Sequence, residues 1–146
     1  MSLPKLIVHT DVIVDYLLHH GPNPPLLRLL MMKFFCYTTV FNAIELFALA
    51  GNARERKAIE DSLSAMKILG LNAKQAKRFG DLFNRNASPA VLDTLAAGIC
   101  IESRLPLVTG RGGRYKGMKE LRVIRSASVK ATMTAKQIMA LARPPG

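Results

Sequence analysis

Residues 5–17, KLIVHTDVIVDYL, combine an apolar run, a polar break and a second apolar pattern. Leu6 to Val8 are too few for anything but a buried strand, whereas the apolar residues of 12–17 fall at helical spacing. Thr10 is the expected N-cap, and Asp11 lies in the first turn, where the helix dipole favours a carboxylate. In an open α/β sheet ligands bind at the carboxyl ends of the strands, so polar side chains at this break are candidates for chemistry.

Strand-like and helical patterns alternate along the rest of the chain. Asn42 is a possible cap for the helix after the second strand, Asn72 for a later helix, and Ser88 followed by Pro89 marks the start of another. This alternation predicts an α/β fold, a three-layer α/β/α arrangement with a mostly parallel central sheet. The strands after the first are expected at residues 34–40, 67–71, 106–109 and 121–124.

The length and hydrophobic content set the number of domains. A chain of 146 residues with 49% hydrophobic residues can fill one core. We expect one domain over residues 1–125 and a C-terminal extension over residues 126–146. The extension contains a short amphipathic helix at about residues 134–142, where Thr134 and Gln137 have the spacing of a capping box.

Cysteine use and hydropathy bear on the compartment. Cys36 and Cys100 lie in apolar segments without metal-ligand spacing, so we expect buried thiols and no disulfide. The N-terminus lacks a signal-peptide pattern. Charged and polar residues interrupt the apolar stretch 26–50 well short of a membrane span. These features predict a cytoplasmic protein with no membrane partner.

The charge is distributed unevenly. The net charge is +11, and residues 104–146 hold 10 Lys and Arg against one acid, whereas residues 1–103 hold 11 against 9. A one-sided basic segment suits a polyanion, because each phosphate contact releases condensed counterions. A solvated basic surface would have the same composition, and charge alone favours nucleic acid only weakly.

Few acids lie where strands end or where the following helices begin. They are Asp11, Glu45 and Asp93, with Asp15 one turn behind Asp11. Taken singly, each is better explained as a helix-terminal or solvated carboxylate. Together they can converge on one crevice of a parallel sheet, where they would repel one another unless a hard cation such as Mg²⁺ or Mn²⁺ lay among them.

These residues carry a resemblance to a known family. HTDVIVDYL at residues 9–17 resembles the opening motif of PIN domains, most of all that of the small VapC-type toxins. TVFNAIEL at 39–46 resembles their second motif, which ends in Glu-Leu, and DTLAA at 93–97 their third. LPLVT at 105–109 followed by LRVI at 121–124 resembles the closing pattern. The motifs occur in the family's order and at its separations.

The resemblance implies a divalent-metal-dependent endoribonuclease, the toxin of a toxin–antitoxin pair. Its partners would be RNA, an antitoxin protein and a second copy of the chain, and its cofactor Mg²⁺ or Mn²⁺. The position-by-position match implies catalytic roles for His9, Asp11, Glu45 and Asp93, with the last three as metal ligands. The basic residues expected to contact RNA are Arg111, Arg114 and Lys116.

Three residues depart from the family pattern. His9 stands where the family has its first Asp, while Arg111 and Arg114 replace an Asn and an acid or His after the closing strand. A neutral imidazole is a poor ligand for Mg²⁺ but an acceptable one for Mn²⁺ or Zn²⁺. In one reading Asp11 takes over as ligand and the arginines grip the scissile phosphate. In the other, Arg114 pairs with Glu45 or Asp93 in a degenerate PIN domain that binds RNA or a protein without cutting.

Overall fold

A parallel sheet forms the centre of the molecule. The computed structural model describes residues 3–85 and 90–146, and within them the strand order is β3-β2-β1-β4-β5. All four pairings between neighbouring strands are parallel. The strands are β1 (Lys5–Val8), β2 (Phe35–Thr39), β3 (Lys67–Leu69), β4 (Leu107–Thr109) and β5 (Val123–Arg125).

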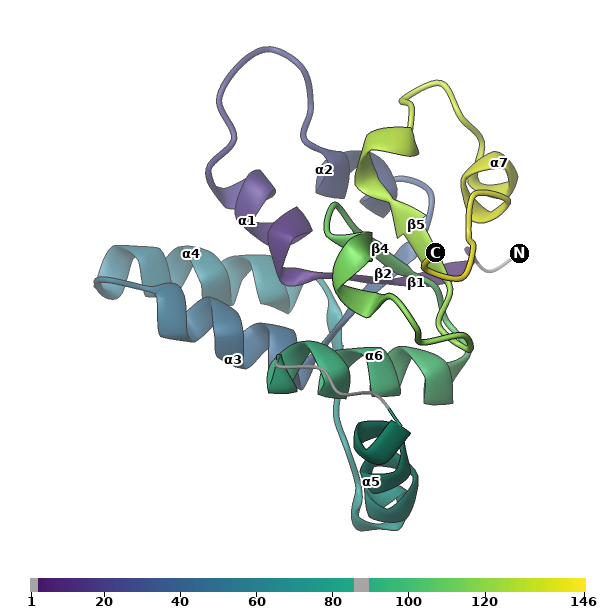
Figure 1. Ribbon diagram of the computed structural model, residues 1–146. Coiled ribbons are helices and arrows are strands. Elements are labelled where there is room, and N and C mark those ends of the chain that lie inside the picture. The colour runs from purple at the N-terminus through teal and green to yellow at the C-terminus, as the bar shows by residue number, and fades with distance from the viewer. Residues whose placement is uncertain (1–2, 86–89) are drawn as a thin grey trace.

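Helices cover both faces of this sheet, as Figure 1 shows. On one side lie α1 (Thr10–Leu17), α2 (Leu26–Met31) and α7 (Ala135–Met139). On the other lie α5 (Ala76–Arg85) and α6 (Val91–Ser103). Near the end of the sheet where β1 runs into α1, α3 (Val40–Leu49) packs against α4 (Ala53–Ser64). Three short 3₁₀ helices complete the described elements: η1 (Ala73–Gln75), η2 (Gly112–Tyr115) and η3 (Ser126–Ser128).

The central strand β1 explains why the sheet needs two cover layers. Leu6 and Val8 belong to one hydrophobic cluster, whereas Ile7 belongs to the other, and all three are fully buried. Successive side chains of a strand point to opposite faces, so an uninterrupted apolar run must be covered on both. The predicted three-layer α/β/α fold is confirmed, and the sheet is parallel throughout the described strands.

The helix caps differ from the prediction at two places. His9, not Thr10, is the N-cap of α1, and Thr39, not Asn42, is the N-cap of α3. The two residues predicted as caps contact each other instead: the Asn42 side-chain amide donates to the Thr10 hydroxyl at 2.9 Å. This hydrogen bond joins α1 to α3 across 32 residues of sequence, which local propensity does not encode.

The other predicted boundaries hold within a few residues. The expected strand at 121–124 lies at Val123–Arg125, and the predicted start at Ser88 and Pro89 falls outside the described residues. Cys36 and Cys100 are buried free thiols, as expected. None of the described helices is long and apolar enough to cross a membrane.

The C-terminal segment is packed rather than loose. The capping box of Thr134 and Gln137 is present at the start of α7, which is shorter than the predicted 134–142. Ile138 is buried in the same core cluster as Leu6 and Val8 of β1. Val123 of β5 forms an antiparallel bridge with Arg143, so the chain end extends the sheet edge by a short step. A division of the chain at residue 125 stays a prediction.

Candidate active site

Three potential metal-binding side chains meet beyond the carboxyl ends of the strands. His9 follows β1 directly, Glu45 lies on α3 after β2, and Asp93 lies in the first turn of α6. One donor atom from each lies within 4.8 Å of the other two. His9 and Glu45 line a crevice of about 410 Å³, and Arg111 and Arg114 lie on its wall. The fold therefore brings these residues together from three separate parts of the chain.

His9 is held between two carboxylates. Its side chain is 2% exposed, with Nδ1 3.1 Å from Asp11 Oδ1 and Nε2 3.1 Å from Asp93 Oδ1. Burial, the largest single influence, lowers the pKa of His9, but the hydrogen bonds and charges of Asp11 and Asp93 together outweigh it and raise the pKa to about 9. Without a metal ion, His9 is therefore an imidazolium at neutral pH and donates to both acids.

The carboxylate of Asp11 already accepts hydrogen bonds from the end of β4 and the residue after it. Its Oδ2 accepts from the Gly110 backbone N–H at 2.7 Å, and the Thr109 hydroxyl lies 3.1 and 3.2 Å from the two carboxylate oxygens. Burial raises the pKa of Asp11, but the hydrogen bonds from His9 and Gly110 outweigh it, so the net shift is downward. Asp11, predicted as a metal ligand, lies outside the group of three converging donors. Its contacts are those of a side chain that orients His9.

Asp93 joins His9 to the loop after β4. Its Oδ1 lies 3.1 Å from His9 Nε2 and 3.5 Å from the Tyr115 hydroxyl, and Arg114 donates to Oδ2 at 3.2 Å. The hydrogen bond from His9 is the main cause of the lowered pKa of Asp93, and Arg114 adds to it against burial. Of the two acids considered as partners for Arg114, the structure selects Asp93.

The remaining predicted residues differ in placement. Glu45 is half-buried, and no hydrogen bond or ion pair links it to the described part of the chain. Arg111 is exposed, and Arg114 keeps 46% of its side chain exposed. Lys116 is exposed as well, but it does not line the crevice. Of the three predicted RNA-contacting residues, Arg111 and Arg114 thus line the crevice.

The donor atoms suit a divalent ion that binds a nitrogen ligand as well as oxygen ligands. The 3.1 Å between His9 Nε2 and Asp93 Oδ1 is close to the separation of neighbouring ligands around an ion with bonds of about 2.2 Å. Histidine ligands in proteins usually donate their second ring N–H to a carboxylate, as the His9 Nδ1 contact with Asp11 would allow. One imidazole and two carboxylates suit Mn²⁺ better than Mg²⁺.

Thr109, Gly110 and Tyr115 are the site residues that the sequence interpretation missed. The Thr109 hydroxyl and Gly110 N–H fix Asp11, while the ring of Tyr115, fully buried, meets the imidazole of His9 edge-on at 6.0 Å between centroids. A polar residue at the last position of β4 was a usable signal for Thr109. No local pattern pointed to Tyr115.

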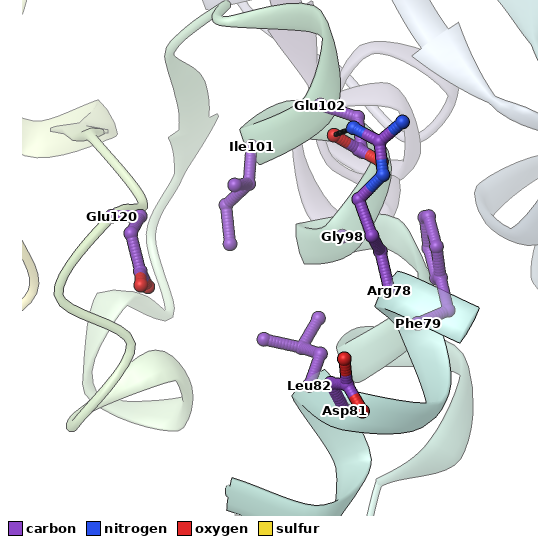
Figure 2. Close-up of a pocket in the computed structure, with 8 residues that line it drawn as sticks. All are labelled: Arg78, Phe79, Asp81, Leu82, Gly98, Ile101, Glu102 and Glu120. Carbon is purple, nitrogen blue, oxygen red and sulfur yellow. Dashed lines mark hydrogen bonds and ion pairs between the residues drawn. The ribbon is translucent and has the colours of Figure 1, made fainter. Parts of the chain in front are cut away.

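A second hollow, of about 160 Å³, lies away from this site between α5 and α6 (Figure 2). Arg78 of α5 pairs with Glu102 of α6 at 2.9 Å on one side of it. Gly98 of α6 lies against Phe79 so closely that a Cβ there would come within 2.3 Å of the ring. These contacts pack α5 against α6.

Solved structures provide one comparison. The chain resembles VapBC2 from Rickettsia felis bound to promoter DNA, with 19% identity, coverage of 82% of this chain and 96% of that chain, and a TM-score of 0.67. DNA-bound VapBC from Salmonella typhimurium gives 17% identity, 85% and 99% coverage and a TM-score of 0.67. For FitAcB from Neisseria gonorrhoeae the identity is 15%, the coverage is 85% of this chain and 99% of that chain, and the TM-score is 0.64. At these identities the likeness is one of fold.

Sequence comparison gives the family. No curated protein matches the chain. The sequence model of the PIN domain, however, matches residues 6–120, which include most of β1 and the residues of the crevice. The match spans most of the chain and agrees with both the observed sheet and the family predicted from the motifs. The chain therefore belongs to the PIN domain family.

Proposed function

We propose that this PIN domain is a divalent-metal-dependent endoribonuclease. The observation that carries the proposal is the convergence of donor atoms from His9, Glu45 and Asp93 within 4.8 Å. Arg111 and Arg114 line the same crevice, so cations lie beside the candidate ligands. Metal ligands with guanidinium groups beside them suit a phosphodiester substrate. A phosphodiester carries a negative charge, and that charge increases when a nucleophile attacks the phosphorus.

His9, Glu45 and Asp93 would hold the ion, and of the two expected ions we favour Mn²⁺ over Mg²⁺ because of the imidazole. A bound divalent ion lowers the pKa of a coordinated water and neutralises charge on the attacked phosphate. Asp11 acts as a positioning residue: it accepts the Nδ1 proton of His9, which leaves Nε2 directed toward Asp93.

The arginines would bind the substrate. Arg114 is half-exposed and pairs with Asp93, so its guanidinium can transfer from that carboxylate to a phosphate oxygen. Arg111 is exposed on the same wall of the crevice and offers a second cation. Lys116 lies outside the crevice and is proposed to contact RNA beyond the scissile phosphate.

Cleavage of a labelled single-stranded RNA tests this proposal. We expect cutting by the purified protein with Mn²⁺, none in EDTA, and loss of cutting in Glu45→Gln and Asp93→Asn, which keep the side-chain size. Glu60→Gln, an exposed acid on α4, is the matched control and should cut like wild type. Absence of cutting with any divalent ion, or equal cutting by the site variants, would refute the proposal.

A second candidate function is RNA binding without cleavage. It is favoured by one observation: the charge of Asp93 is already balanced by His9 on one oxygen and Arg114 on the other. This candidate predicts salt-sensitive RNA binding in EDTA with no change in RNA length. Metal-dependent cutting that Glu45→Gln abolishes would rule it out.

We also propose that the protein is the cytoplasmic toxin of a toxin–antitoxin pair. The solved structures with this fold include complexes described as VapBC and as toxin–antitoxin. An apolar groove of about 300 Å³ runs between α1, α3 and α4, and its lining includes Leu18 and Leu49, which are 69% and 66% exposed. A groove of this kind suits an amphipathic helix of a partner protein.

Coexpression with the product of the adjoining reading frame tests the antitoxin proposal. Copurification and loss of RNA cutting in the complex are expected. A neighbouring product that neither binds this protein nor inhibits its RNA cutting would contradict it.

We also propose that the chain forms a homodimer. Light scattering on the isolated chain tests this, because a monomer mass at all concentrations would exclude it.

A further inference from the structure

The basic C-terminal segment places two arginines side by side at the sheet edge. The antiparallel bridge between Val123 and Arg143 is closed by two backbone hydrogen bonds of 2.7 and 3.0 Å. Side chains alternate along a strand and paired residues share a face, so Arg125, two positions after Val123, lies on the same face as Arg143. Both arginine side chains are exposed.

These two arginines line a hollow of about 390 Å³ between η2 and the chain end. Its wall on the η2 side is Gly112, where a Cβ would lie 3.7 Å from the Arg125 guanidinium carbon. No acid is among the residues that line the hollow, and within the described ranges no ion pair engages Arg125 or Arg143. The lining of the hollow therefore holds two guanidinium groups and no acidic side chain.

The hollow begins where the candidate active site ends. Arg111 lines the active-site crevice and Gly112, the next residue, lines the hollow. The two depressions thus lie on either side of one short turn of chain. A polyanion that contacts Arg111 and Arg114 in the crevice can pass over Gly112 onto Arg125 and Arg143.

We propose that Arg125 and Arg143 form a second binding site for the phosphate backbone of single-stranded RNA, continuous with the active-site crevice. The inference rests on the proposed action on RNA and adds the surface that holds the strand beyond the cut. Of the residues that line this hollow, all except Gly112 lie after residue 120, where the match to the PIN domain ends. The C-terminal segment thereby gains a role in substrate binding.

Fluorescence anisotropy with a labelled single-stranded RNA in EDTA tests the proposal, because EDTA keeps the RNA intact. Each phosphate contact on a single strand contributes about 0.7 to the slope of log affinity against log salt, so the double variant Arg125→Ala, Arg143→Ala should lower the slope by about 1.4 and the affinity at about 0.1 M salt by about 25-fold. The matched control, Lys74→Ala with Lys77→Ala, removes two exposed cations near α5 and should change neither.

The outcomes separate this inference from the proposed function. If wild type binds RNA and the double variant has the same slope and affinity, the second site is refuted while the active site stands. If wild type does not bind RNA, the proposed function fails with it. Tighter binding of duplex DNA than of RNA, with the same loss in the double variant, would overturn the assignment to RNA. A circular dichroism melting curve like that of wild type confirms that both variants are folded.

Discussion

The titration of His9 gives the sharpest quantitative prediction. In protein freed of metal, the pKa of His9 rises from its ordinary value of 6.5 to about 9, because Asp11 and Asp93 outweigh the effect of burial. A raised pKa in the folded state stabilises the fold below pH 6.5, and that stability is lost as the pH rises through 9. The shift corresponds to about 3 kcal/mol in the free energy of unfolding.

Proton NMR and urea unfolding measure this effect. The imidazole resonance that disappears in His9→Gln identifies the group, and its midpoint in EDTA should lie near pH 9. Between pH 6 and pH 10 the free energy of unfolding of wild type should fall by about 3 kcal/mol more than that of the variant. Comparison with the variant removes the contributions of other groups that titrate over this range.

A His9 midpoint at or below pH 6.5 would contradict this prediction, because it would mean that burial outweighs the two carboxylates. A constant difference in the free energy of unfolding between wild type and His9→Gln, with no extra fall for wild type between pH 6.5 and pH 9, would refute it independently.

Three further substitutions test the packing and the charge of the site. Gly98→Ala should cost roughly 1–3 kcal/mol in urea unfolding, because its Cβ would meet the buried Phe79 ring at 2.3 Å, whereas Gly80→Ala, which meets nothing within 4 Å, should cost nothing; equal effects would contradict this. Asn42→Ala should cost about 1–3 kcal/mol, because it removes the acceptor of the buried Thr39 hydroxyl and the amide that donates to the buried Thr10 hydroxyl; an unchanged melting temperature would argue against it. Arg114→Gln should tighten Mn²⁺ binding roughly tenfold in calorimetry, because it removes the partly solvent-screened guanidinium that competes with the metal for Asp93; weaker binding would contradict this.

Most of the fold is encoded in local patterns. The run from Leu6 to Val8 has no polar member, and such a strand needs both faces covered, which already implies three layers. The helix caps could not be assigned in the same way, because His9 and Thr10 are adjacent and both polar. The hydrogen bond that occupies Thr10 comes from Asn42 on another helix.

The sequence predicts which residues form the candidate site, but it does not predict the hydrogen bonds and ion pairs that join them. Glu45 and Asp93 could be chosen because acids at strand ends are few in this chain. That His9 bridges Asp11 and Asp93 depends on a contact across 84 residues, and the choice of Asp93 over Glu45 by Arg114 depends on side-chain geometry. The sequence allows both of these arrangements, and only packing decides between them.

Whether His9, Glu45 and Asp93 form a metal centre can be seen by anomalous diffraction from crystals soaked in MnCl₂. We expect one anomalous peak bonded to His9 Nε2 and to the carboxylates of Glu45 and Asp93, with Arg114 displaced from Asp93. A map with no peak at this position, and with Arg114 still paired to Asp93, would contradict it.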